Sequence, residues 1–155
     1  MPERVITGLE PYDLRCDWME CPLGVDSSPP RLSWKLRSDA PSQRQTGWQV
    51  MVASSAQLLA GDHADIWDSG RQPDDAQLHV PFAGRALASS EQVFWKVRVW
   101  DREGRLSRWS EPATWTMGVL RQAEWRAHWI TDSELLSWVR TKIGYRSQAT
   151  TNEYE

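Results

Sequence analysis

The sequence predicts an all-β fold, an antiparallel β-sandwich with one short helical turn. Three segments, 31–36, 47–53 and 92–100, alternate apolar and polar residues with the period of two that is typical of half-buried strands. Gly, Pro or Asp residues separate about six or seven short segments of this kind. No long helical segment alternates with them, as a parallel βαβ fold would require.

The clearest strand is predicted at Gln92–Trp100, in which every second residue is apolar: Val93, Trp95, Val97 and Val99. Leu32, Trp34 and Leu36 give Arg31–Leu36 one apolar face, and Trp48, Val50 and Val52 do the same for Gly47–Ala53. Met51 makes the other face of that second strand less polar. Turn residues at 101–104 predict a hairpin to Ala113–Met117, with a connection lengthened by 105–112.

Weaker patterns predict strands at Leu14–Trp18, Ile66–Ser69 and Gln77–Val80. The short helix is expected at 55–60, where Ser54 or Ser55 can cap the start and Gly61 the end. Because the sequence pattern changes near Gly118, we expect the sandwich to span residues 1–120. Residues 121–155 are then a linker and the truncated start of a following domain.

Composition excludes some classes of partner. The net charge of -3 offers no broad positive field for a phosphate backbone, so no nucleic acid is expected. No apolar stretch is long enough to cross a bilayer, and no export signal follows Met1, so no membrane partner is expected. A cytoplasmic location follows if Met1 is the true start; otherwise the localisation is unknown.

Tryptophan is unusually frequent, with 11 residues against 2 Phe and 3 Tyr. Four indoles fall in predicted loops or on outer faces and are candidates for carbohydrate or interdomain contact: Trp18, Trp67, Trp100 and Trp109. The alternative is structural: Lys96, Arg98 and Arg108 lie over Trp100 and Trp109 as a ladder of cations and rings.

Metal and cofactor sites have little support. Asp62, Asp65 and Asp68 lack a calcium-loop pattern with a closing Glu and are equally consistent with turns. Cys16 and Cys21 with His63 and His79 lack a second closely spaced ligand pair for zinc. We therefore expect no metal and no cofactor, and two free thiols or a local disulfide.

Motifs for acyl or phosphoryl transfer are absent, and no catalytic residue is predicted. An ordered set of motifs, however, resembles the N-terminal domain of bacterial α-L-rhamnosidases. The resemblance covers about residues 8 to 130, and the segments that carry it follow the family's order: 14–26, 30–34, 43–55, 67–70, 94–101, 109–112 and 125–130. Segment 138–148 is similar to the start of a discoidin-like carbohydrate-binding insertion.

The resemblance implies a fibronectin type III-like or immunoglobulin-like sandwich ahead of further domains, the last an α/α-barrel. In that family the barrel supplies the two carboxyl groups of an inverting glycosidase. We therefore expect a non-catalytic accessory module that packs on downstream domains of the same polypeptide and contributes to substrate presentation. The alternatives are a stand-alone fibronectin-like protein-interaction module and an autonomous module that binds rhamnose-containing glycosides.

Overall fold

The computed structural model describes residues 8–126, and the chain divides into two compact units, 1–124 and 125–155. The strands of the first unit are β1 (Glu10–Cys16), β2 (Leu23–Val25), β3 (Arg31–Arg37), β4 (Gly47–Ala53), β5 (Trp67–Asp68), β6 (Val80–Pro81), β7 (Gln92–Trp100) and β8 (Ala113–Met117). Helix α1 (Ala56–Ala60) follows β4, and the 3-10 helix η1 (Gln122–Glu124) follows β8.

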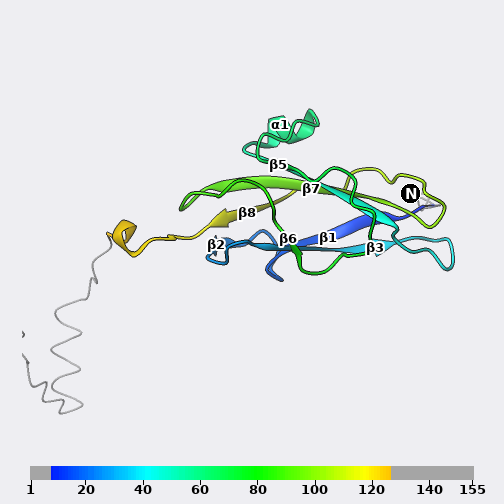
Figure 1. Ribbon diagram of the computed structural model, residues 1–155, viewed down its shortest axis with the longest axis horizontal. Coiled ribbons are helices and arrows are strands. Elements are labelled where there is room, and N and C mark those ends of the chain that lie inside the picture. The colour runs from blue at the N-terminus through cyan, green and yellow to red at the C-terminus, as the bar shows by residue number, and fades with distance from the viewer. Residues whose placement is uncertain (1–7, 127–155) are drawn as a thin grey trace, which may run out of the picture. The chain divides into compact units, whose positions relative to one another are not determined.

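Two sheets form an immunoglobulin-like sandwich (Figure 1). One has the order β1-β3-β6 and the other β2-β8-β7-β4-β5. All pairs are antiparallel except β2 with β8, which run parallel. The parallel pair differs from the purely antiparallel sandwich that the sequence predicts.

The core lies between the sheets and is dominated by indoles. Trp34, Trp95 and Trp115 are fully buried and pack with the alternating valines of β4 and β7. Trp95 and Trp115 meet edge to face, with ring centroids 6.3 Å apart. The period-two patterns of the strands thus place one face of each in a common core.

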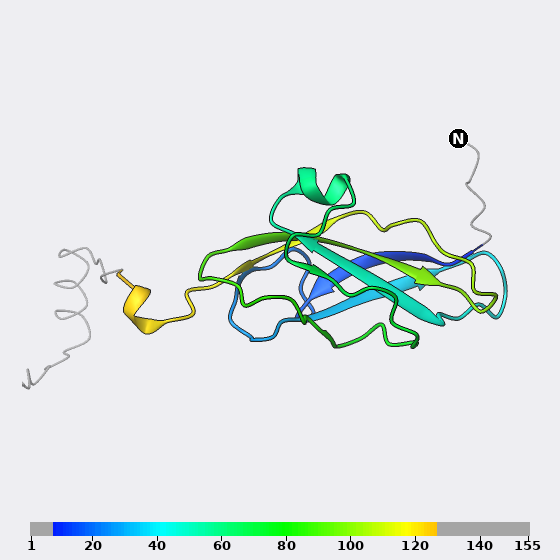
Figure 2. The ribbon, with the colours of Figure 1, turned by 45° about the horizontal axis from the view of Figure 1, so that its top comes forward.

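A second, smaller cluster lies outside the larger sheet. Helix α1 covers the outer side of β4 and β7 (Figure 2), and its Leu59 packs on Met51 and Ala53. The helix starts at Ser55, whose Oγ accepts a hydrogen bond from Leu58 N, and Gly61 caps its end. Strand β4 is therefore buried on both faces, which explains the apolar Met51 on its outer side.

The strong sequence patterns coincide with β4, β7 and β8 at both ends, and the hairpin of β7 with β8 is confirmed. The weaker predictions are wrong in their bounds. Strand β1 starts four residues before Leu14, so Trp18 lies in the turn that follows it. Strands β5 and β6 are shorter than expected because each pairs over two residues only.

Strand β2 was not predicted, since three residues of which one is Gly24 carry no alternation. Residues 127–155, which hold most of the predicted linker and following domain, lie outside the described residues, so that domain boundary stays a prediction. Within 8–126, no helix is long and apolar enough to cross a membrane.

Candidate functional site

Trp100 and Trp109 belong to a ladder of cations and rings on the outer face of the larger sheet. Arg98 Cζ lies 4.4 Å from the Trp109 ring centroid and 5.9 Å from that of Trp100. Arg71 covers Trp100 at 4.8 Å, and Lys96 Nζ lies 4.7 Å from the Trp109 centroid. Trp100 and Trp109 are therefore stacked with cations of the domain itself, which is the alternative to ligand contact that the sequence offers.

The ladder differs in two ways from the predicted one. Arg71, distant in sequence, takes the place expected for Arg108, which makes no ring contact in the described part of the chain. Lys96 is buried, not displayed on an outer face, because its ammonium donates to Leu59 O at 2.6 Å and pairs with Asp62 under α1. The apolar outer residues Met51 and Phe94 were the available sequence signal for such a cover.

Trp67 is half-buried and packs against the main core. Its ring meets Phe82 edge to face at 5.4 Å, and Phe82 in turn meets Trp115 at 5.5 Å. Much of this indole is thus committed to packing, although the sequence makes it a candidate for carbohydrate or interdomain contact.

Trp18 is different, because 59% of it is exposed. It stands at φ 70° after Asp17 at φ 46°, and the reciprocal hydrogen bonds of Cys16 and Met19 close the turn. Positive φ at both central residues defines the type I′ hairpin geometry, in which Asn-Gly is preferred and a bulky residue is strained. His79 meets the Trp18 ring edge to face at 4.5 Å.

Asp17 fixes this strained turn in place. Its carboxylate accepts hydrogen bonds from Ser27 Oγ and, at 3.1 Å, from Arg31 N, while its own N–H donates to Arg31 O at 2.8 Å. Arg31 also contacts His79 Nδ1 at 3.3 Å. The exposed indole is thus held on a rigid support and not on a loose loop.

Exposed apolar side chains also lie near the point where the chain leaves the sandwich. Leu23 is 81% exposed on β2, and its register partner Thr116 lies next to the last residue of β8. Val119 and Leu120 follow directly and are 42% and 38% exposed. We call Leu23, Val119 and Leu120 the exit-end patch.

The exit segment itself is hydrogen-bonded to the sandwich. Gly118 N donates to Val25 O and Leu120 N to Ser89 Oγ, both within 2.9 Å. Ser89 Oγ also donates to Glu124, which pairs with Arg121. The path of the chain is thereby fixed as far as η1.

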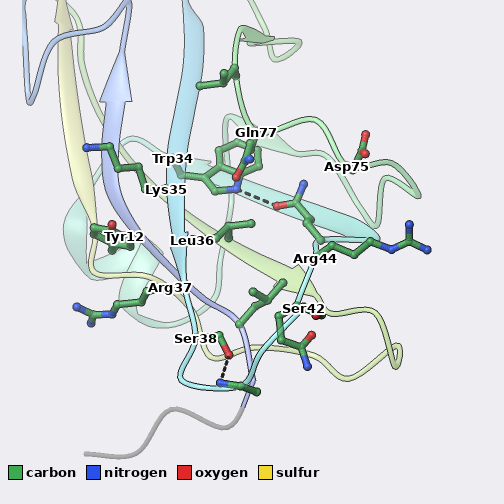
Figure 3. Close-up of a pocket in the computed structure, with 15 residues that line it drawn as sticks. Tyr12, Trp34, Lys35, Leu36, Arg37, Ser38, Ser42, Arg44, Asp75 and Gln77 are labelled. Carbon is green, nitrogen blue, oxygen red and sulfur yellow. Dashed lines mark hydrogen bonds between the residues drawn. The ribbon is translucent and has the colours of Figure 1, made fainter. Parts of the chain in front are cut away.

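A groove of about 630 Å³ lies on the smaller sheet beside β3 (Figure 3). Buried Trp34 and Leu9 and half-buried Leu36 line it together with exposed Tyr12 and Leu78. Apart from Ala40, its remaining lining is polar: Lys35, Arg37, Ser38, Ser42, Gln43, Arg44, Gln45, Asp75 and Gln77. Sequence reasoning missed this groove, since it depends on how little of β3 is paired with the two-residue strand β6.

Asp65 and Asp68, two of the three aspartates considered as calcium ligands, accept hydrogen bonds from neighbouring residues instead. Asp65 accepts from Ser54 N and Oγ, at 2.8 and 2.6 Å, and the side-chain hydrogen bond keeps its pKa below the usual value. Asp68 Oδ1 accepts from Gln49 and from Gly70 N. Within residues 8–126, no three His, Cys, Asp or Glu side chains gather as metal ligands.

Cys16 and Cys21 are both free, Cys16 buried and Cys21 exposed. Burial, aided by the charge of Asp17, raises the pKa of Cys16 to about 12. The thiol is therefore neutral and shielded, unlike a catalytic cysteine.

Carboxyl groups with raised pKa values mark general acids in glycosidases. Every shift resolved for a carboxyl group in residues 8–126 is downward: Asp13, Asp65, Glu91, Asp101 and Glu124. Hydrogen bonds or ion pairs within the sandwich lower each of them. These groups are suited to holding loops together, not to donating a proton to a leaving group.

The family described as Rha78A-like, N-terminal immunoglobulin domain matches residues 11–121. The chain belongs to this family. It is an N-terminal immunoglobulin-like domain of the α-L-rhamnosidase type, as the sequence motifs predict.

Relatives of this rhamnosidase-type domain are parts of much longer chains. An α-L-rhamnosidase of Streptomyces avermitilis is 45% identical over 115 residues, which are 74% of this chain and 11% of that protein. One of Alteromonas sp. is 38% identical over 110 residues, 70% of this chain and 12% of its own. The chain thus spans about an eighth of the length of these curated relatives.

Solved structures agree with the fold. The crystal structure of Streptomyces avermitilis α-L-rhamnosidase complexed with L-rhamnose superposes with a TM-score of 0.76 at 41% identity, covering 83% of this chain and 12% of that one. The α-L-rhamnosidase from Dictyoglumus thermophilum gives 0.75 at 37% identity, covering 80% and 14%.

Proposed function

We propose that this domain is a non-catalytic accessory module of an α-L-rhamnosidase, a hydrolase of terminal L-rhamnose, and that it packs on downstream domains of the same polypeptide. The observation that carries the proposal is the exit-end patch beside a hydrogen-bonded exit segment. Relatives that continue for several times the length of the domain supply the polypeptide that would cover it.

Exposed leucine and valine side chains favour burial against a neighbour. Full burial of one such side chain contributes about 1.5–3 kcal/mol, so Leu23, Val119 and Leu120 together can hold two domains in a fixed orientation. Interdomain packing then positions downstream domains and, through them, the substrate.

Trp18 is the indole best suited to act as an anchor in this contact. Trp100 and Trp109 already lie under cations, and Trp67 packs on Phe82, whereas most of Trp18 is free. It lies five positions before Leu23 in the sequence, a span of at most about 18 Å. A strained backbone that presents a large aromatic side chain is typical of a functional contact.

The proposal is tested in the rhamnosidase polypeptide that contains this domain together with the domains after it. Leu23→Asp with Val119→Asp is expected to lower the unfolding temperature of this part of the polypeptide by about 2–4 °C for each kcal/mol lost, the scale for a unit of about 150 residues or more. The same changes in the isolated 155-residue chain should have little effect, because both side chains are exposed there. Leu106→Asp, 45% exposed on a different loop, is the matched control. Equal effects of the double variant and the control would refute the packing.

Sugar binding is a second candidate, favoured by the exposed Trp18 alone. An indole can stack on the apolar face of a sugar ring, so titration of the isolated chain with L-rhamnose or rhamnosides would change its indole fluorescence and the change would saturate. The packing proposal expects no saturable change up to millimolar sugar and no release of an aryl group from an aryl rhamnoside. Saturable quenching that Trp18→Ala removes would establish the carbohydrate-binding alternative instead.

A further inference from the structure

The edge of β3 that faces away from β1 is only partly paired. Strand β6 pairs with it at Arg31 and Leu32, and Trp34 N then donates to Gln77 O at 3.1 Å. Backbone groups of successive strand residues point to opposite sides. Leu36, two residues after Trp34, therefore directs its N–H and C=O toward the β6 side, where no described strand reaches it.

The pairing on the β1 side supports this assignment. Asp17 N donates to Arg31 O, so the odd-numbered residues of β3 face β1. Pro11, which has no N–H to donate, lies opposite Leu36 and so costs the β1 ladder no hydrogen bond at that position. The groove thus lies beyond the first residue of the short β6 and exposes a bare strand edge with the half-buried Leu36 beneath it.

Charged groups without a partner lie across the groove from this edge. Figure 3 shows Tyr12, Lys35 and Arg37 on one side of β3, and Gln77, Asp75 and Arg44 on the other. Lys35 and Arg37 are paired with Asp13 and Glu10, whereas the side chains of Arg44 and Asp75 make no hydrogen bond or ion pair within residues 8–126.

The rings in the groove are unsuited to stacking on a sugar. Trp34 is 1% exposed, and the guanidinium of Arg37 lies over the Tyr12 ring, 5.2 Å from its centroid. What the groove does offer is a backbone donor and acceptor, an apolar floor and two charges of opposite sign. These are the features that recognise an extended polypeptide segment added to a sheet edge.

We propose that the groove binds an extended segment from another domain of the same polypeptide, which adds to the smaller sheet beside Leu36 in line with β6. The identity of the occupant rests on the proposed function, since most of each rhamnosidase relative lies outside the matched domain and would be tethered to it. Arg44 and Asp75 then pair with charges of opposite sign on that segment. The groove and the exit-end patch share no residue, so either proposal can fail alone.

Nuclear magnetic resonance on the isotope-labelled chain tests the proposal. The probes are overlapping synthetic peptides of about 12 residues that tile the Streptomyces avermitilis α-L-rhamnosidase outside its matched domain, each added to about 1 mM so that weak binding is detected. One overlapping set is expected to shift the Leu36 amide signal and slow its hydrogen exchange, which in the free chain should be faster than that of Lys35.

Two variants separate edge pairing from other binding. Leu36→Pro removes the edge donor, and Arg44→Glu reverses the charge without touching the backbone; each is expected to weaken the peptide at least about tenfold. Arg108→Glu, an exposed arginine outside the groove, should bind as the parent does. No peptide that shifts Leu36, equal binding by Arg44→Glu, or a shift caused by L-rhamnose and not by any peptide would overturn the proposal.

Discussion

The guanidinium of Arg98 lies between two indoles, with its Cζ 4.4 Å from the Trp109 ring centroid, and its Nε donates to Gln49 Oε1 at 2.9 Å. Gln49 is buried and donates onward to Asp68, so Arg98 joins the ladder to the hydrogen bonds of β4 and β5. Side chains of the larger sheet therefore cover the outer face of β4 and β7 around Arg98.

Replacement of Arg98 tests the ladder. Arg98→Ala removes the two ring contacts and leaves Gln49 Oε1 without its donor, which should cost about 1–2 kcal/mol in the free energy of unfolding. Arg108→Ala, which removes an exposed arginine outside the ladder, should stay within about 0.5 kcal/mol. Urea denaturation measures both. Equal costs for the two variants would mean that the stacking contributes nothing.

Two core tryptophans should respond differently to the same change. Trp34 Nε1 donates to buried Gln45 Oε1 at 3.0 Å, whereas the buried Trp115 Nε1 has no partner. Trp34→Phe and Trp115→Phe lose the same volume, but only the first leaves a buried acceptor unpaired. We expect Trp34→Phe to be the more destabilising by about 1–3 kcal/mol in urea denaturation. The reverse order would contradict these hydrogen-bond assignments.

Asp101 should make stability depend on pH. Its carboxylate is 1% exposed; burial opposes its ionisation, but hydrogen bonds from Arg105 N, Glu103 N and the Arg105 guanidinium prevail and lower its pKa below 3.8. A lowered folded pKa stabilises the fold fully above the unfolded value, and this contribution is lost as the pH falls through the folded value.

The comparison with Asp101→Asn isolates this group from the other carboxylates. The parent should exceed the variant in stability at neutral pH by about 1.5–3 kcal/mol, and the difference should shrink as the pH falls below about 4. Urea midpoints across that range measure it. A difference that grows on acidification would show that the sign is wrong.

The two cysteines should label at very different rates. Cys21 is exposed, whereas Cys16 is buried with a pKa raised to about 12, so little reactive thiolate forms at Cys16. A thiol reagent at neutral pH should modify Cys21 alone in the native chain and both residues in denaturant. Native labelling of Cys16 at the rate of Cys21 would contradict the burial of that thiol.

Sequence patterns predict the parts of the fold that local alternation controls. Strands β4, β7 and β8 follow from residues that face a core every second position, and Ser55 follows from helix-cap chemistry. Strand β2 could not be predicted, because its pairing with β8 is a contact between segments more than 90 residues apart, as the register of Leu23 with Thr116 shows.

In the candidate site, too, the sequence predicts some features and not others. The sequence singles out Trp18, Trp100 and Trp109, and it predicts cations above the last two. It does not reveal that Arg71 reaches Trp100 or that α1 buries Lys96, because each contact joins distant segments that meet only in the fold. It does not reveal the strained turn at Trp18 either, because Asp17-Trp18 lacks the Asn-Gly pair that such a turn prefers.

Hydroxyl-radical oxidation followed by mass spectrometry tests the central claim most directly, that another domain covers the exit end. In the isolated chain, Trp18 and Leu23 are exposed and should be oxidised readily. In the longer rhamnosidase polypeptide, both should be oxidised several-fold more slowly, while Leu106 keeps its rate. Unchanged oxidation of Trp18 and Leu23 in the longer polypeptide would contradict the account.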